Sequence, residues 1–258
     1  MKILILIYLY IQMPISPNQG STSGGTTVTI TGVNLASTIR VNFGKNLATI
    51  TANTPTSVTV IAPAGNGVAD VSVTTSGGTS NFLYFYYIPS PIMLSLNPTS
   101  GSATGGNTVE ITGYNLSTAS NVNFGANSAT PTILNDGLIS VVAPEGTIGS
   151  VHVNVTTAGG TSSSLYYSYV DAPTVNALTP TSGSSTGGTV VTITGTGLQT
   201  TTNVIFGGVS ASFGVINSTT ISAVTPPGTV GAVDFVVTTS GGSATIVEGY
   251  VYLSEPGI

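Results

Sequence analysis

The chain has 258 residues, of which only 4% are charged, and its formal net charge is −5. Its three basic side chains, Lys2, Arg40 and Lys45, are too few to neutralise several phosphates, which excludes a nucleic-acid partner. Cysteine is absent, so disulfide frameworks and thiolate chemistry are excluded as well. Because 40% of the residues are hydrophobic, the composition argues against intrinsic disorder.

The first eleven residues form a separate apolar segment. The run Ile3–Ile11 is about half of the ~20 residues that a membrane-spanning helix requires, so we expect no membrane span. One interpretation is the remnant of an export signal, although no small-residue cleavage site follows it. The other is a β-strand that buries itself against a sheet edge of the first domain or of a neighbouring chain. An aromatic-x-Tyr-aliphatic-x-x-Pro spacing recurs at residues 8–14, 85–91, 167–173 and 250–256, so the segment also resembles the closing strand of a preceding repeat, an interpretation of equal weight to the export signal.

Three copies of one pattern follow this segment. Gly24–Gly32 reads GGTTVTITG and returns 81 residues later as GGNTVEITG and a further 82 residues later as GGTVVTITG. A Val-x-Phe-Gly segment and a Thr-Thr-x-Gly-Gly segment recur with nearly the same spacing. Internal repetition of this kind indicates an array of similar domains. We therefore expect repeat 1 at 12–88, repeat 2 at 89–171 and repeat 3 at 172–253, with 254–258 as a tail or the start of a further repeat.

Within each repeat, hydrophobic residues alternate with polar ones, as in strands with one buried face. Val28 and Ile30 point one way in repeat 1 while the flanking threonines point the other, and Phe43 is the largest core residue of the next strand. Further strands are expected at 58–61, 69–73 and 82–87, the last after a Gly-Gly turn. The expected core residues of the three repeats are Val28, Ile30, Phe43, Val109, Ile111, Phe124, Val191, Ile193 and Phe206.

About seven short strands in roughly 80 residues are typical of an immunoglobulin-like β-sandwich. The predicted fold is therefore all-β, with three tandem sandwiches in a linear array. Repeat 1 departs from the pattern at its beginning, because Pro14–Gly20 stands where the other repeats have the longer segments Met93–Gly101 and Val175–Gly183. We expect its first strand to be short or irregular.

The motifs also resemble a known family over about residues 12 to 253. Each repeat shows, in order, Pro-x-Ser-Gly or its variant, Gly-Gly-x-x-Val-x-Ile-Thr-Gly-x-x-Leu, Val-x-Phe-Gly, Pro-x-Gly and Thr-Thr-x-Gly-Gly, which resembles the IPT/TIG family. The resemblance implies an early-set immunoglobulin-like sandwich. Such domains occur in plexin-type receptors, in Rel-type transcription factors, beside starch-acting enzymes and in arrays on bacterial surface proteins. The family has no active site to carry over.

Candidate chemical residues are few and isolated. His152 is expected to point outward from a strand beside Asn154, with no nucleophile or second ligand near it. Asp136 and Glu145 lie in loops of repeat 2 only and are too few for a calcium site. We therefore predict no catalytic, cofactor-binding or metal-binding residue, and no enzyme.

Asparagine-x-Ser/Thr triplets begin at Asn115, Asn154 and Asn217. They are possible glycosylation sites in a eukaryotic host, although a chain rich in Ser and Thr produces such triplets by chance.

The closing strands are rich in tyrosine. Tyr84, Tyr86, Tyr166 and Tyr250 are expected on outer faces, where exposed rings stack on sugars or anchor a partner. The alternative is that these rings pack against the linker prolines Pro91 and Pro173.

Three functional hypotheses follow, all without catalysis. The leading one is an extracellular or cell-surface structural array, such as a spacer, adhesin or fibre component, whose partner is a protein or a glycan. The second is a carbohydrate-binding accessory module. The third is a virion or filament subunit that binds other copies of itself through edge strands or an exchanged N-terminal strand.

Overall fold

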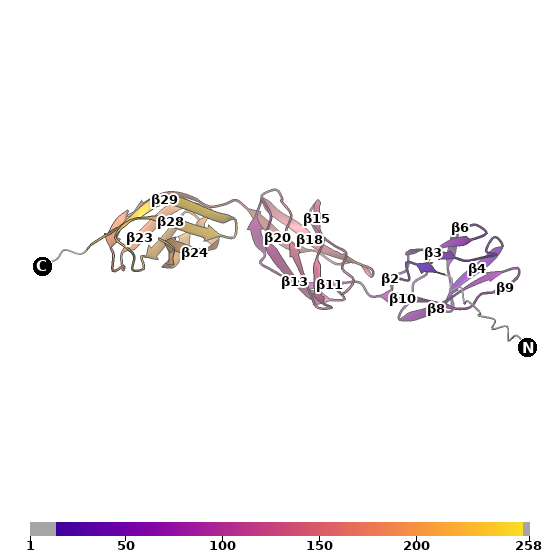
Figure 1. Ribbon diagram of the computed structural model, residues 1–258. Helices are drawn as coiled ribbons and strands as arrows, with labels where there is room; N and C mark the ends of the chain where they lie inside the picture. Colours follow the sequence, from indigo (N-terminus) through magenta and orange to yellow (C-terminus); the bar gives the residue numbers. More distant parts are fainter. Residues whose placement is uncertain (1–13, 255–258) are drawn as a thin grey trace, which may run out of the picture.

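The computed structural model describes residues 14–254. Three β-sandwiches lie in a row, joined by short linkers, with the two ends of the chain at opposite ends of the row (Figure 1). The only helix among the described residues is a single 3₁₀ turn, Leu198–Thr200, so the all-β prediction is confirmed. No helix in this part of the chain has the length and apolar character needed to cross a bilayer.

Each repeat contains two sheets that face each other. In repeat 1 one sheet has the order β1-β3-β7-β6 and the other β2-β10-β8-β4-β5, with β9 paired to β8. The first strand changes sheets, since β1 pairs antiparallel with β3 whereas β2 pairs parallel with β10. The strands are β1 (Ile15–Ser16), β2 (Gln19–Ser21), β3 (Thr27–Thr31), β4 (Thr38–Phe43), β5 (Asn46–Leu47), β6 (Thr49–Asn53), β7 (Ser57–Ile61), β8 (Val68–Thr75), β9 (Gly78–Thr79) and β10 (Leu83–Ile88).

Repeats 2 and 3 have the same topology. The strands of repeat 2 are β11 (Ile92–Asn97), β12 (Ser100–Ser102), β13 (Thr108–Tyr114), β14 (Asn121–Phe124), β15 (Asn127–Ala129), β16 (Thr132–Asn135), β17 (Leu138–Val142), β18 (Gly149–Thr157), β19 (Gly160–Thr161) and β20 (Leu165–Val170). Those of repeat 3 are β21 (Thr174–Thr179), β22 (Ser182–Ser184), β23 (Val190–Thr196), β24 (Thr201–Phe206), β25 (Val209–Ser210), β26 (Ser212–Asn217), β27 (Thr220–Val224), β28 (Gly231–Thr239) and β29 (Gly242–Leu253).

Each sandwich encloses its own hydrophobic core. Alternation along the strands sends the apolar side chains inward, and all nine residues expected in the cores are at most 2% exposed. Phe43 packs edge to face against Phe85 with 5.1 Å between the ring centroids, and Phe124 packs against Tyr167 in the same way at a centroid distance of 5.3 Å. Leu35 and its counterparts Leu116 and Leu198 are also buried, at the end of the sandwich that receives the chain.

The first strand of repeat 1 is short, as the sequence indicated. β1 has two residues, whereas its counterparts β11 and β21 have six each. The closing strand of repeat 3 differs in the opposite sense, because β29 runs unbroken over 12 residues where repeats 1 and 2 have two separate strands. The expected N-terminal strand at 1–11 lies outside the described residues.

Candidate functional site

The linker between repeats 1 and 2 is held by side chains and backbone of repeat 2. Ser90 donates a hydrogen bond from its hydroxyl to the carbonyl oxygen of Gly159, at 3.1 Å. The Asn115 side-chain amide donates to the carbonyl oxygen of Ser90, also at 3.1 Å. Pro91 is buried at the end of this linker. The linker is therefore clasped between the Asn115 loop and the turn that joins β18 to β19.

A glycine at the tip of that turn makes the clasp possible. A Cβ atom on Gly159 would overlap the carbonyl oxygen of Pro89, so only glycine lets the turn approach the linker this closely. The junction between repeats 2 and 3 has the same close contact between turn and linker, because a Cβ atom on Gly241 would overlap the carbonyl oxygen of Asp171. Pro173 is buried there as Pro91 is in the first junction. Both junctions therefore press linker backbone against a Gly-Gly turn.

Asp136 holds in place the Asn115 loop, which contacts the linker at the first junction. Its carboxylate accepts hydrogen bonds from the backbone N–H groups of Asn115 and Ser117, both at 3.2 Å. Hydrogen bonds from the side chain and backbone of Ser117, together with the one from Asn115, hold the pKa of the Asp136 carboxyl below its ordinary value of 3.8. Asn115 adopts a left-handed conformation with φ of 59°, and this carboxylate fixes the loop that contains it.

The opposite end of each sandwich is closed by a tyrosine. Tyr87 donates a hydrogen bond of 2.8 Å from its hydroxyl to the carbonyl oxygen of Pro63, and its ring covers Gly65, where a side chain would meet the ring. Tyr169 and Tyr252 repeat this arrangement in the other repeats. The recurring Pro-x-Gly motif is therefore a loop shaped to receive a tyrosine ring.

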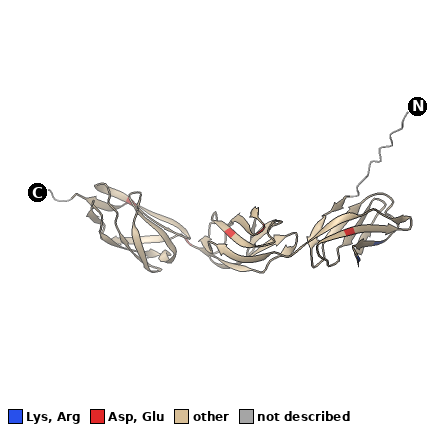
Figure 2. Ribbon diagram, turned by 90° about the horizontal axis from the view of Figure 1, so that it is seen from below, with Lys and Arg blue, Asp and Glu red and all other residues tan. Residues whose placement is uncertain are grey.

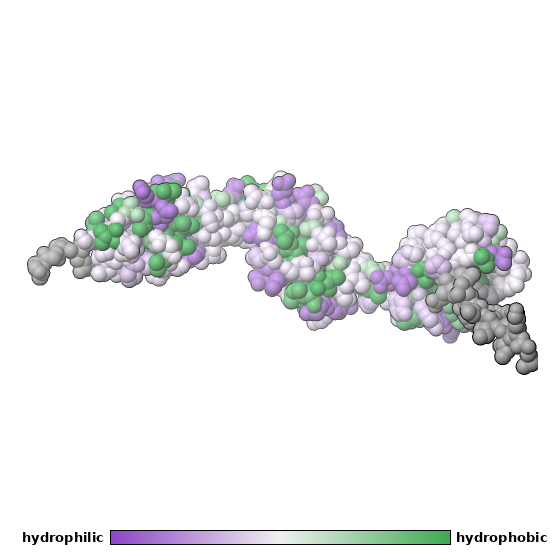
Figure 3. Space-filling view, viewed as in Figure 1, coloured by the Kyte–Doolittle hydropathy of each residue, from purple (hydrophilic) through white to green (hydrophobic). Residues whose placement is uncertain are grey.

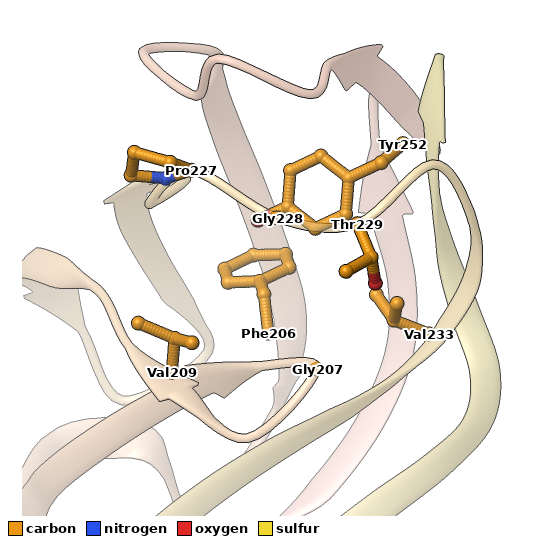
Figure 4. A pocket seen from close by; sticks show the side chains of 8 residues that line it. All are labelled: Phe206, Gly207, Val209, Pro227, Gly228, Thr229, Val233 and Tyr252. Atoms are coloured by element: carbon orange, nitrogen blue, oxygen red, sulfur yellow. The ribbon is translucent and has the colours of Figure 1, made fainter. Parts of the chain in front are cut away.

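Repeat 3 has a hollow at this end. In repeats 1 and 2 the side chains of Asn46 and Asn127 donate to loop carbonyl oxygens, at 2.9 and 2.8 Å. Val209 stands at the corresponding position of repeat 3 and has no such donor. A cavity of about 370 Å³ lies between the rings of Phe206 and Tyr252 (Figure 4), and one of about 280 Å³ lies at this end of repeat 2, lined in part by Asn127. The remaining residues that line the repeat 3 cavity are Gly207, Val209, Pro227, Gly228, Thr229 and Val233. None of them is charged, so the hollow accommodates an apolar group and offers no acid–base chemistry.

Repeat 1 exposes three aromatic rings, two on β10 of its six-stranded sheet and one just before it. Phe82, Tyr84 and Tyr86 are 60%, 55% and 43% exposed. Alternation places the two tyrosines of β10 on one face, and on β8 Asp70 lies opposite Tyr84 while Val68 lies opposite Tyr86. These rings are therefore exposed to solvent.

Tyr166 is likewise exposed, but the prediction for Tyr250 is wrong. Tyr250 is fully buried and contacts Phe206 edge to face at 5.1 Å. An irregularity in the pairing of β28 with β29, between Val233 and Phe235, shifts the alternation. Glu248 has a φ of 52° at this point, and Tyr250 thereby occupies the inward position that Tyr167 has in repeat 2.

The structure places His152 and the three asparagines apart. His152 is exposed on β18, where its ring lies 4.7 Å from that of Tyr166. Asn154 accepts a hydrogen bond from Asn123 at 2.8 Å, and Asn217 accepts bonds from the Thr219 amide and hydroxyl. Asn115 is committed to the first junction. Glycosylation of these residues stays a prediction.

Charge is sparse over the array (Figure 2). Between residues 14 and 254 no three histidine or carboxylate side chains gather closely enough to hold a metal ion. The visible face is mostly of intermediate hydropathy, with small hydrophobic patches on the repeats (Figure 3). The features that stand out are thus the two junctions, the aromatic face of repeat 1 and the hollow of repeat 3.

Sequence reasoning missed the role of the turn glycines. The Thr-Thr-x-Gly-Gly motif predicts a hairpin, and the second glycine does adopt a positive φ, 118° at Gly160. The first glycine of the motif, Gly159 in repeat 2, does not have a positive φ, yet every repeat has a glycine at this position. A glycine that recurs without needing a positive φ indicates that another segment of the chain packs too closely for a side chain.

Comparison with known proteins gives a consistent picture. The model of the IPT/TIG domain matches three times, at residues 13–87, 91–169 and 173–252. Rat (Rattus norvegicus) Plexin-A3 is 28% identical over 220 residues, which cover 72% of this chain and 11% of Plexin-A3. A structure of the plexin A4 extracellular region, domains 1 to 10, aligns with a TM-score of 0.50 at 17% identity, over 92% of this chain and 28% of that one. The chain thus spans only a small part of these relatives.

Proposed function

Because the chain belongs to the IPT/TIG domain family, we propose that it is a non-catalytic extracellular spacer whose exposed surfaces meet a protein or glycan partner. The extracellular assignment is supported by the plexin relative and by the plexin A4 extracellular region, which shares the fold. A surface with little charge and no clustered acid, base or metal ligand among residues 14–254 supports a role without catalysis.

The observation that carries the proposal is the repeated junction. Gly159 and Gly241 let two successive linkers press against the repeats that follow them, and a buried proline ends each linker. Proline fixes φ near −65°, so each linker has few backbone conformations to lose. Two junctions built alike hold three sandwiches in a defined line, which is what a spacer requires.

A distance measurement tests this proposal. The chain has no cysteine, so spin labels are attached to cysteines introduced at the exposed positions Thr79 of repeat 1 and Ser243 of repeat 3. We expect a narrow distance distribution by pulsed electron spin resonance. The control is a variant with a flexible Gly-Ser insertion after Ser90. If the distance distribution of the natural chain is as broad as that of this variant, the proposed spacer role is contradicted.

The aromatic face of repeat 1 supports glycan binding as a second candidate function. Exposed rings stack on the apolar faces of sugars, and the carboxylate of Asp70 beside Tyr84 accepts hydrogen bonds from hydroxyl groups. Glycan-array binding should then be lost in the variant Tyr84→Ala/Tyr86→Ala. The matched control is Tyr166→Ala, which removes a ring that is even more exposed, from repeat 2. Equal binding by all variants, or none by the natural chain, would refute this candidate.

A further inference from the structure

The two linkers of the array meet the repeats that follow them with different side chains. Ser90 of the first linker corresponds to Ala172 of the second, 82 positions further on, and Asn115 corresponds to Gly197 by the same offset. Asn115 and Gly197 both have a left-handed backbone conformation, with φ of 59° and 69°, so the two loops have the same shape. The two junctions can therefore be compared residue by residue.

The side-chain hydrogen bonds of the first junction have no equivalent in the second. At the first junction the Ser90 hydroxyl donates to the Gly159 carbonyl oxygen, and the Asn115 amide donates to the Ser90 carbonyl oxygen. Ala172 has no hydroxyl and Gly197 has no side chain, so neither bond can form at the second junction. Both junctions keep the contact between the linker backbone and the Gly-Gly turn.

A hollow of about 280 Å³, here called the junction hollow, lies where the Asn115 contact is missing. It is lined by residues 170–172 of the second linker and by the loop around Gly197 of repeat 3. At the first junction the Asn115 side chain joins the corresponding loop to the linker. The second linker is thus held on the side of the turn and unsupported on the side of the loop.

The second linker also has more backbone freedom than the first. Asp171-Ala172-Pro173 stands where the first linker has Pro89-Ser90-Pro91. Proline fixes its own φ near −65° and restricts the residue that precedes it. The first linker therefore has two fixed φ angles where the second has one.

The walls of the junction hollow that belong to repeat 3 are themselves fixed. The Ser240 hydroxyl of the Gly-Gly turn donates to the Thr200 hydroxyl of the loop at 2.8 Å. Leu198, next to Gly197, is buried in the core, and its amide donates to the Ser218 carbonyl oxygen at 2.9 Å. A change of shape at this junction therefore takes place in the linker and not within repeat 3.

We propose that the second junction is the hinge of the array, at which repeat 3 tilts relative to repeat 2 by closing and reopening the junction hollow. This inference rests on the spacer function proposed above and refines it, since repeats 1 and 2 form one stiff unit and repeat 3 is the movable one. The close contact at Gly241 and the buried Pro173 remain, so the tilt is smaller than that of a flexible linker.

Distances across each junction test the hinge in the full-length chain, which has no cysteine of its own. Spin labels are attached to cysteines introduced at Thr27 and Thr108 for the first junction, and at Thr108 and Val190 for the second. These three exposed residues begin β3, β13 and β23, so the two pairs occupy equivalent positions. We expect the distance distribution across the second junction to be about twice as wide as that across the first, yet narrower than with a flexible Gly-Ser insertion after Ala172.

The outcomes separate the hinge from the spacer. Two equally narrow distributions would overturn the hinge and leave the spacer intact. If both distributions are as broad as those of variants with Gly-Ser insertions in the two linkers, spacer and hinge are both contradicted.

Exchanging side chains between the junctions tests the physical cause. Ala172→Ser/Gly197→Asn supplies the missing groups and should narrow the second distribution to the width of the first. The site accepts asparagine, because Asn115 has the same backbone conformation and a Cβ atom on Gly197 would lie 3.4 Å from the Pro173 Cα atom, an ordinary contact distance. The reverse exchange, Ser90→Ala/Asn115→Gly, should broaden the first distribution to the width of the second. If either exchange leaves the width of its junction unchanged, the proposal is overturned.

Gly197→Ala is the matched control, since it removes the glycine without supplying an amide. It should leave the second distribution broad, and narrowing equal to that of Ala172→Ser/Gly197→Asn would show that the hydrogen bonds are not the cause. Residual dipolar couplings provide a measurement without labels. In the natural chain repeats 1 and 2 should share one alignment tensor and repeat 3 should have a smaller one. One tensor common to all three repeats would refute the hinge.

Discussion

The hydroxyl group of Tyr169 donates a hydrogen bond of 2.8 Å to the carbonyl oxygen of Pro144, whereas the hydroxyl of Tyr167, two residues earlier on the same strand, is buried without a partner. The two rings contact each other edge to face at 5.2 Å. One strand therefore carries one satisfied and one unsatisfied hydroxyl group in the same core. Repeat 3 has the same pair in Tyr252 and Tyr250.

The satisfied hydroxyl should stabilise repeat 2. We expect Tyr169→Phe to lower its free energy of unfolding by about 1 kcal/mol, because the bond to the Pro144 oxygen is lost. Urea unfolding followed by hydrogen exchange in repeat 2 measures the change. Tyr166→Phe, which removes an exposed hydroxyl, is the control. Equal stability of the natural chain and Tyr169→Phe would show that the bond contributes nothing.

The unsatisfied hydroxyl should do the opposite. Removing it in Tyr167→Phe should leave stability unchanged or raise it, because a buried polar group without a partner costs about 1–3 kcal/mol. Phe85 already occupies this position in repeat 1, so the core accepts the ring without the hydroxyl. The reverse change, Phe85→Tyr, should destabilise repeat 1, and a clear loss of stability in Tyr167→Phe would contradict the expectation.

The buried Tyr167 hydroxyl also predicts that repeat 2 loses stability at alkaline pH. Burial, followed by the influence of Tyr169, raises the pKa of Tyr167 from 10.0 to about 12. Because the folded state favours the neutral form, its contribution is complete below pH 10 and falls as the pH rises from 10 to about 12. Urea midpoints of repeat 2 across this range should fall less steeply in Tyr167→Phe than in the natural chain. If the urea midpoints of the two proteins change with pH to the same extent, the pH dependence does not come from Tyr167.

Asp136 predicts an acid effect on the first junction. Its pKa is lowered, so its contribution is present above its ordinary value of 3.8 and is lost as the pH falls through the folded-state value. Lowering the pH from 5 to 2.5 should broaden the distance distribution between labels in repeats 1 and 2. Asp136→Asn should show the broad distribution already at pH 5, since an amide oxygen carries no charge. A distribution that is equally narrow in both proteins and at both pH values would rule out this role.

The turn glycines should control the geometry of the array. Gly159→Ala is expected to displace the linker, because its Cβ would overlap the Pro89 carbonyl oxygen, while repeat 2 remains folded. Small-angle X-ray scattering should report a changed maximum dimension. Gly214→Ala is the control, since a Cβ there meets nothing within 4 Å and its φ is not positive. Identical scattering curves for the two variants would argue against the clasp.

Periodicity in the sequence was sufficient to predict the three sandwiches, the inward residues of β3, β4 and β8, and the short first strand of repeat 1. Burial dictates these features locally, since a strand with one face in a core must alternate. The edge strands β6, β16 and β26 were not predicted, because they are mostly exposed and carry no such alternation. Tyr250 was placed on the wrong face, although the recurring aromatic-x-Tyr spacing aligns it with the buried residues Phe85 and Tyr167.

The sequence by itself determined the fold, the repeat spacing and the absence of recognisable catalytic motifs, because each of these is present in residue type and order along the chain. The tertiary structure decided which surfaces matter. Only the folded chain brings Pro89 onto Gly159, 70 residues further on, or opens a hollow between the rings of Phe206 and Tyr252. These contacts depend on the approach of segments distant in sequence. The physical reason is close packing, since a glycine without a positive φ has a consequence only when another segment lies against it.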